Sequence, residues 1–308
     1  MKVSVIIPCH NGEDFVAKAI HSVLNQTHTD VECIVIDDAS RDRSREIILA
    51  ISEKDQRVVP ILLDRNAGPS AARNKAIDIA TGEWITLLDA DDLYKEDRLE
   101  VLLDLARKTD ADAVVDNQSV RNFGDDRHVF DAFGFLKGSN PIPISQELFF
   151  RETVPVAFMN SGYLKPMFRR DYLIRNKLRY QEDCRVGEDF LLYSDFVTLN
   201  PKFYGTSYAG YIYFRRPNSL TRSGSSLQNL AAMSDELIAR LGSRLTPASV
   251  KALETRKKVI IKHARWKDFR QALSAKDLKK ATGLLLGDPT LVFMVKNFVR
   301  RRLQERGL

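Results

Sequence analysis

The 308-residue sequence has no long hydrophobic run and no recognisable leader segment. No apolar stretch reaches the ~18 residues that a membrane-spanning helix needs, so we expect no such helix. The first residues, MKVSVIIPCHNGEDF, have the pattern of a strand that enters a loop and lack the small-residue cleavage site of a signal peptide. We therefore expect a cytoplasmic protein.

The sequence also has few cysteines and lacks the glycine-rich motif of dinucleotide-binding enzymes. Cys9, Cys33 and Cys184 are odd in number and have no metal-binding spacing. They fit a reducing compartment better than a disulfide framework. No G-x-G-x-x-G follows a predicted strand, which disfavours a dehydrogenase. The composition, 44% hydrophobic and 29% charged, is that of a globular protein with a sizeable core.

The net charge of +6 conceals a basic C-terminal end. Residues 251–308 contain 16 Lys and Arg but five Asp and Glu, whereas the preceding residues contain 31 basic and 36 acidic side chains. Within 289–308, apolar residues recur at helical spacing beside basic ones. This pattern predicts either a helix on an anionic membrane surface, peripheral on the inner face of the cytoplasmic membrane, or a helix docked on the rest of the protein. The tail lacks interleaved aromatics, so we expect no nucleic acid partner.

The first 115 residues alternate between apolar runs rich in Val and Ile and segments with helical spacing. The pattern predicts strands over 3–8, 32–37, 58–63, 83–89 and 112–117, separated by helices over 13–26, 43–51, 69–80 and 99–106. Such alternation implies an α/β fold, a mostly parallel sheet with helices on both faces. Further along, we expect a helix over 187–199, a strand over 208–216, and helices from about 226 onward. The expected units are therefore 1–225 and a basic helical region, 226–308.

Polar clusters follow each of the first four predicted strands. They are Pro8–Gly12, Asp37–Ser40, Asn66–Asn74 and Asp89–Asp92. Because ligands bind beyond the carboxyl ends of parallel strands, these clusters predict one shared site. Asp38 is suited to accept a hydrogen bond from a ring N–H or a ribose hydroxyl. Arg73 is suited to bind phosphate or sugar. The adjacent carboxylates of the fourth cluster favour Mg²⁺ or Mn²⁺, completed by substrate phosphates.

Five segments, in this order, resemble glycosyltransferase family 2, the inverting sugar transferases with the GT-A fold, and in particular the bacterial exopolysaccharide and surface-glycan enzymes. They are SVIIPCHNGEDFVAKAIHSVLNQT (4–27), IVIDDASRDRS (34–44), NAGPSAARNKAI (66–77), LLDADDLYKEDRL (87–99) and GEDFLL (187–192). The resemblance covers roughly residues 1–225 and implies a Rossmann-like GT-A catalytic domain. It also implies a nucleotide-diphospho-sugar donor, UDP-linked, a Mn²⁺ or Mg²⁺ cofactor, and a glycan or lipid-linked acceptor.

The resemblance also implies roles for individual residues. Pro8, His10 and Asp38 would line the base pocket, with Asp38 accepting from the uracil imide N–H; the family often has Tyr where His10 stands. Asp89 and Asp91 match the DxD motif. Asp89 would face ribose or sugar and Asp91 would bind the metal.

Three further assignments follow from the resemblance. Asp92 could share the metal role. Asp189 matches the acidic residue that acts as catalytic base, although it could also be a first-turn acid that stabilises a helix. Arg216 and Ser219 fall in a region that closes over the diphosphate in relatives.

Two other functions compete with a sugar transferase. A nucleotidyltransferase that makes sugar nucleotides would follow its first strand with a glycine-rich phosphate loop and a basic residue, whereas PCHNGED has one glycine and two acids. A non-catalytic, transferase-like binding module is disfavoured because Asp91 and Asp189 are both present. The leading hypothesis is therefore a metal-dependent transferase.

Overall fold

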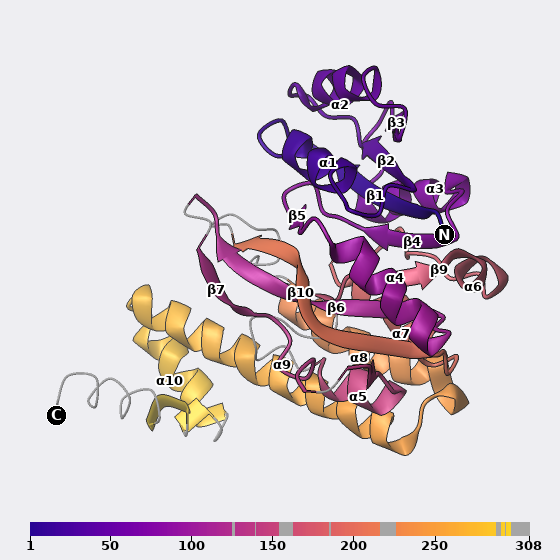
Figure 1. Ribbon diagram of the computed structural model, residues 1–308. Helices are drawn as coiled ribbons and strands as arrows, with labels where there is room; N and C mark the ends of the chain where they lie inside the picture. The colour runs from indigo at the N-terminus through magenta and orange to yellow at the C-terminus, as the bar shows by residue number, and fades with distance from the viewer. Residues whose placement is uncertain are drawn as a thin grey trace.

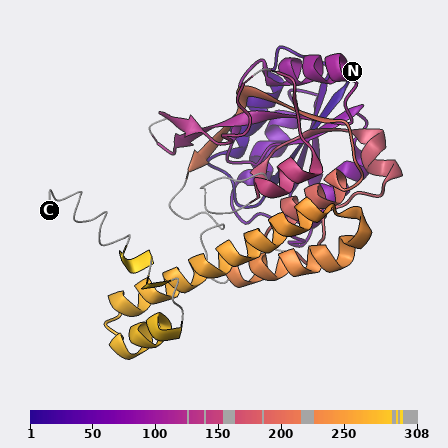
Figure 2. The same ribbon diagram turned by 90° about the horizontal axis from the view of Figure 1, so that it is seen from below.

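The structure is a computed structural model that describes residues 1–124, 127–138, 140–153, 163–184, 186–215, 226–287, 291–292 and 294–296. A twisted sheet crosses the body of the molecule, and a helical C-terminal region extends away from one side of it (Figures 1 and 2). Arg216 and Ser219 lie outside the described residues, as does most of the tail expected to form a basic helix.

The sheet has the strand order β3-β2-β1-β4-β9-β6-β10-β5. Parallel pairing joins β3 (Val58–Leu62), β2 (Val31–Asp37), β1 (Val3–Cys9) and β4 (Trp84–Leu87). The same kind of pairing joins β6 (Ala113–Asn122) to β10 (Phe203–Arg215). All six strands were predicted from sequence, and their parallel arrangement confirms the α/β expectation.

Antiparallel strands complete the sheet and were not predicted. The short strand β9 (Met167–Arg169) lies between β4 and β6 and runs antiparallel to both. Strands β5 (Leu93–Tyr94), β7 (His128–Asp131) and β8 (Ile142–Pro143) pair at the margins. Strands this short carry too few residues for a recognisable alternation of apolar and polar side chains. The placement of β9 matters because it brings residues just before 167 beside the end of β4.

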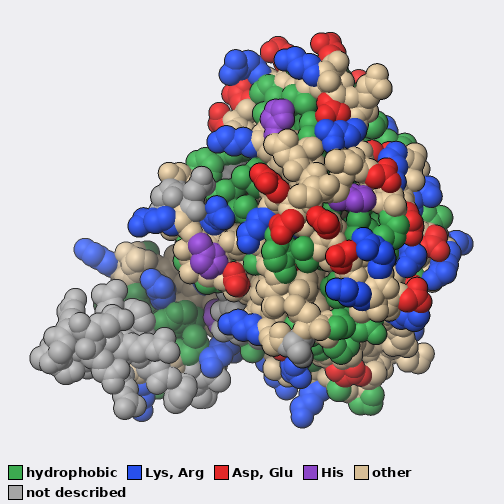
Figure 3. Space-filling view, in the orientation of Figure 1, with side chains coloured by type: hydrophobic (Ala, Val, Ile, Leu, Met, Phe, Trp, Pro, Cys, Tyr) green, Lys and Arg blue, Asp and Glu red, His purple; other side chains and the backbone are tan. Residues whose placement is uncertain are grey.

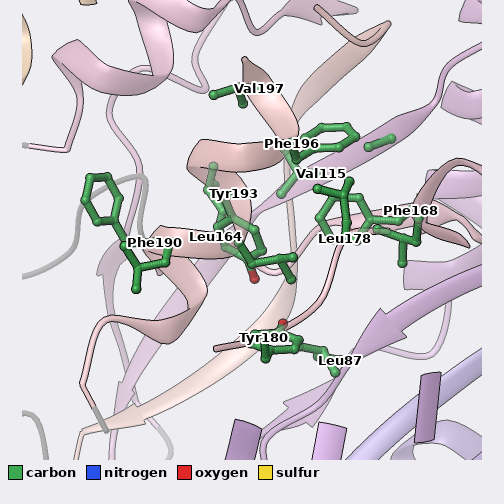
Figure 4. Packing of buried hydrophobic residues seen from close by; sticks show 14 of the residues in the cluster. Leu87, Val115, Leu164, Phe168, Leu178, Tyr180, Phe190, Tyr193, Phe196 and Val197 are labelled. Atoms are coloured by element: carbon green, nitrogen blue, oxygen red, sulfur yellow. The ribbon is translucent and has the colours of Figure 1, made fainter. Parts of the chain in front are cut away.

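Two hydrophobic clusters cover the two faces of the sheet. One contains side chains of α1 (Val16–Leu24), α2 (Ser44–Ser52) and α4 (Arg98–Thr109). The other contains side chains of α3 (Pro69–Ile79), α7 (Glu188–Val197) and the short helices α5 (Gln146–Arg151) and α6 (Arg170–Arg175). Figure 4 shows the second cluster around the aromatic rings of Tyr193, Phe196 and Phe168. Helices on both faces are what buried parallel strands require.

The C-terminal helices are α8 (Ser226–Leu241), α9 (Pro247–Ser274) and α10 (Leu278–Gly287). Met233, Leu237 and Leu253 belong to the same core cluster as α7, so the core continues into this region. A separate small cluster, which includes Trp266 and Phe269, joins the far end of α9 to α10. Figure 2 shows α9 extending beyond the body with α10 at its end. The boundary expected near residue 225 stays a prediction.

Among the described helices, none has both the length and the hydropathy needed to cross a membrane. The three cysteines carry free thiols, and Cys9 and Cys33 are buried. Among the described residues on the face shown in Figure 3, Lys and Arg are mixed with Asp and Glu.

Candidate functional site

A pocket of about 570 Å³ opens at the carboxyl ends of the central parallel strands. Its volume is in the range of sites that bind small molecules. The lining includes six side chains that the sequence predicted to act together: Pro8, His10, Asp38, Arg73, Asp89 and Asp91. The pocket therefore joins the ends of β1, β2 and β4 to the first turns of α3.

Asp38 shapes one wall of this pocket by holding the turn that starts α3. Its two carboxylate oxygens accept hydrogen bonds from the backbone N–H groups of Ala67 and Gly68, at 2.7 and 2.9 Å. Gly68 has φ of 87°, a left-handed conformation that favours glycine. His10 Nδ1 lies 2.7 Å from the Asp38 carbonyl oxygen. A carboxylate oxygen has a second lone pair, so the base-reading role of Asp38 stays a prediction.

Asp89 belongs to a buried network of charged side chains. Lys165 Nζ lies 3.0 Å from its Oδ2, and Arg73 lies 3.3 Å from its Oδ1. Burial opposes ionisation of Asp89, but the two cations prevail and lower its pKa to about 2. Arg73 also donates to Glu188 Oε1 at 2.7 Å. Asp89 is therefore ionised and fixed in place by protein cations.

Asp92 has hydrogen-bond partners within the protein, whereas from the sequence we expect it to share in binding a metal. It is buried, and it accepts hydrogen bonds from the Tyr211 hydroxyl at 2.7 Å and from the Phe214 backbone N–H at 3.0 Å. Burial, followed by the charge of Asp89, raises its pKa to about 7. Asp89 and Asp92 thus each have protein partners. The metal-binding role of Asp92 stays a prediction.

Asp91 is the member of the cluster that best fits a metal ion. Within the described ranges, no group of three or more His, Cys, Asp or Glu could hold a metal. Asp91 nevertheless lines the pocket and offers the hard oxygen ligands that Mg²⁺ and Mn²⁺ prefer. Magnesium commonly takes one or two carboxylates and fills its remaining positions with water and substrate phosphates, so a single pocket carboxylate suits it.

Asp189 lies in the first turn of α7, two residues after the N-cap Gly187, whose φ is 91°. Its side chain is 12% exposed, and its Oδ2 accepts a hydrogen bond from Lys165 Nζ at 3.0 Å. Arg73 lies 3.8 Å from Oδ1. Lys165 and Arg73 thus contact both Asp89 and Asp189, and they join the predicted base to the pocket.

Sequence reasoning missed Lys165 and Glu188. Lys165 stands in the segment LKPMFRR, which matches none of the family motifs quoted above, and it carries no periodic or spacing signal. Glu188 is part of GED, but its neighbour Asp189 drew the functional assignment. In the structure, Arg73 faces the carboxylates of Asp89, Glu188 and Asp189. Three carboxylates around one guanidinium indicate that a second cation is needed, and Lys165 supplies it.

Comparison with known proteins identifies the family. Residues 4–172, more than half of the chain, match Glycosyl transferase family 2. The succinoglycan biosynthesis protein ExoO of Rhizobium meliloti is 35% identical over 224 residues, which are 71% of this chain and 62% of that protein. ExoU of the same organism, also a succinoglycan biosynthesis protein, is 29% identical over 93% of this chain and 83% of its own length. The chain therefore spans less than two thirds of ExoO.

Solved structures share the fold at low sequence identity. S. aureus TarS 1-349 in complex with UDP-GlcNAc superposes with a TM-score of 0.63 at 18% identity, over 92% of this chain and 90% of that one. The mannosyltransferase PcManGT of Pyrobaculum calidifontis, in complex with GDP-Man and Mn²⁺, gives 0.57 at 16% identity, over 95% and 83%. These likenesses confirm the GT-A fold class. Taken with the match over residues 4–172, they show that this chain belongs to glycosyl transferase family 2, among relatives of the bacterial surface-glycan type.

Proposed function

We propose that this protein is a metal-dependent, inverting glycosyltransferase that moves a sugar from a UDP-sugar to a hydroxyl group. The acceptor is a glycan or a lipid-linked glycan in the synthesis of a bacterial surface polysaccharide, on the cytoplasmic side of the membrane. Residues 1–225 would carry the catalytic machinery. A nucleotidyltransferase and a non-catalytic binding module are disfavoured because family and site both point to sugar transfer.

One observation carries the proposal: Asp89 and Asp91 line the same pocket as Pro8, His10 and Asp38. A base-binding wall and an acidic wall in one pocket suit the two ends of a nucleotide diphosphate. The family match and the UDP-GlcNAc complex of TarS support a nucleotide-sugar donor. The GDP-Man complex of PcManGT is a reason to test other bases as well.

The proposed reaction is a direct displacement at the anomeric carbon. Asp189 takes the proton of the acceptor hydroxyl as that oxygen bonds to the anomeric carbon. The bond from the anomeric carbon to the diphosphate oxygen breaks with its electron pair, and UDP departs. The attack comes from the face opposite the leaving group, so the configuration inverts. Arg73 and Asp89 hold the sugar and diphosphate in line.

A divalent cation, when bound beside Asp91, would neutralise charge on the diphosphate. Asp91 would hold it together with the donor phosphates. Asp92 keeps its structural partners, Tyr211 and Phe214, in this assignment.

Calorimetric titration with UDP, GDP, CDP and dTDP, each with and without Mn²⁺, tests the donor site. We expect UDP to bind tightest, and Mn²⁺ to strengthen its binding roughly tenfold or more. Asp91→Ala should abolish the enhancement by Mn²⁺ while leaving metal-free binding similar. Asp104→Ala, which changes a surface carboxylate paired with Arg107, is the matched control and should behave as the wild type. A UDP affinity that does not respond to metal would contradict the proposed site.

We also propose that the basic C-terminal end contacts an anionic membrane surface. Residues 289–308 are mostly outside the described structure, but the neighbouring part of α10 exposes Leu278 and Leu286, at 68% and 83%. Lys276, Lys279 and Lys280 stand in the same stretch. Apolar side chains beside lysines suit the interface of an anionic bilayer.

Deletion of residues 289–308 should weaken sedimentation with phosphatidylserine vesicles by about tenfold or more, since each basic residue near such a surface contributes about 1 kcal/mol. Vesicles of phosphatidylcholine alone are the control and should sediment little of either form. Unchanged sedimentation with lower thermal stability would instead favour the alternative that this segment docks on the protein.

A further inference from the structure

Lys165 lies between the donor side of the site and the proposed base. Lys165 is separated from the start of β9 by Pro166 alone, and its side chain is 8% exposed. Its ammonium group is 3.0 Å from Asp89 Oδ2 and 3.0 Å from Asp189 Oδ2. Burial opposes the charge of Lys165, but the two carboxylates raise its pKa above the usual range. A single cation therefore links the end of β4 to the first turn of α7.

The two oxygens of Asp189 have different surroundings. Oδ2 is occupied by Lys165, at hydrogen-bond distance. Oδ1 is buried and has no hydrogen-bond donor among the described residues, and Arg73 stands 3.8 Å from it. A buried carboxylate oxygen without a donor is costly, and such an atom is expected where a ligand supplies the missing bond. Oδ1 is thus the oxygen left to accept a proton from an acceptor hydroxyl.

The position of Lys165 is fixed from the core side. Its carbonyl oxygen accepts from Arg98 at 2.8 Å, and Arg98 is fully buried. Among the described residues, the charged groups around Asp189 are Arg73 of α3, Lys165, Asp89 beyond β4 and Glu188 of α7. The remaining titratable neighbours are phenols, and burial raises the pKa of each, so they are uncharged near neutral pH: Tyr163, Tyr180 and Tyr193. Without Lys165, three carboxylates would face one guanidinium.

We propose that Lys165 is a positioning residue for the transfer reaction: it holds Oδ2 of Asp189 against the donor-side carboxylate, so that Oδ1 is presented to the acceptor hydroxyl. This inference rests on the proposed function, because it takes Asp189 as the base. Lys165 acts through Asp189 and Asp89 and exchanges no proton with the substrate. Its removal would leave Oδ2 of Asp189 without this hydrogen-bond donor and would remove the cation that links Asp189 to Asp89.

The test compares Lys165→Met and Lys165→Arg with the full-length wild type. For Lys165→Met we expect kcat near neutral pH to fall roughly 30-fold, less than the 10²–10⁴-fold that a positioned general base contributes, because Asp189 itself is still present. Donor affinity should change less than about threefold, because Arg73 still pairs with Asp89. The acidic limb of the kcat profile should move about one unit to higher pH, since an opposite charge at this distance shifts protonation by that order.

Two controls make this measurement specific. Lys165→Arg keeps the charge and should restore the position of the acidic limb. Lys202→Met removes a lysine from a surface pair with Asp110 and should leave both rate and profile unchanged. If Lys165→Met does not fold, Lys165→Gln provides the same comparison, because it can donate a hydrogen bond but carries no charge.

A uniform loss of turnover at every pH, with an unmoved acidic limb, would overturn the inference and leave Lys165 with a packing role. That outcome is compatible with the proposed transferase. Failure of the proposed function has a different signature: normal turnover of Asp189→Asn, or UDP binding that is indifferent to metal.

Discussion

Asp189→Asn should lower kcat by roughly 10²–10⁴-fold, the contribution typical of a positioned general base. The amide cannot take the proton of the acceptor hydroxyl, but it occupies the same volume at the start of α7. Donor affinity should stay within about threefold, since the pocket side chains Asp38, Asp89 and Asp91 are untouched. Initial rates with a UDP-sugar and calorimetric titration with UDP separate these two effects.

The matched control for Asp189→Asn lies on the same helix. Asp195 is in α7 and pairs with Arg240 at 2.7 Å, so Asp195→Asn makes the same chemical change in another ion pair. We expect its turnover to equal that of the wild type. Full turnover of Asp189→Asn would exclude Asp189 as the base and reduce it to a first-turn acid that stabilises the helix dipole.

Arg98→Met should destabilise the fold by about 3–5 kcal/mol, the cost of leaving a buried charge without its partner. Arg98 is fully buried and donates hydrogen bonds to Asp116 through Nε and Nη2, at 2.9 and 2.8 Å. Its guanidinium also stacks over the ring of Tyr94, 4.2 Å from the centroid. Methionine fills similar space, so the loss would come mainly from the uncompensated carboxylate. The midpoint of urea unfolding, with the slope held constant, measures the change.

The control for Arg98→Met is Arg107→Met on the same helix, α4. Arg107 pairs with Asp104 at 2.9 Å, but both side chains are about half exposed. Exposed pairs contribute about 0–1 kcal/mol, so the midpoint should hardly move. Equal midpoints for the two variants would contradict a dominant role for the buried pair.

Local patterns were sufficient to predict the architecture. Runs such as VSVIIPC and VECIVID became buried parallel strands, because apolar, β-branched runs of this length suit a sheet covered on both faces. The convergence of Asp38, Asp89 and Asp91 also followed, since the carboxyl ends of parallel strands share one edge. The antiparallel strand β9 was missed, because three residues carry no periodic signal.

Amino-acid sequence alone determined the alternation of strands and helices, the family, and the edge of the sheet at which the site would lie. These depend on patterns within short segments and on the geometry of parallel strands. The tertiary structure decided how each acidic side chain is compensated: Lys165 and Arg73 for Asp89, Tyr211 and a backbone N–H for Asp92. Buried charges depend on neighbours brought together from distant segments, and no local pattern encodes those contacts.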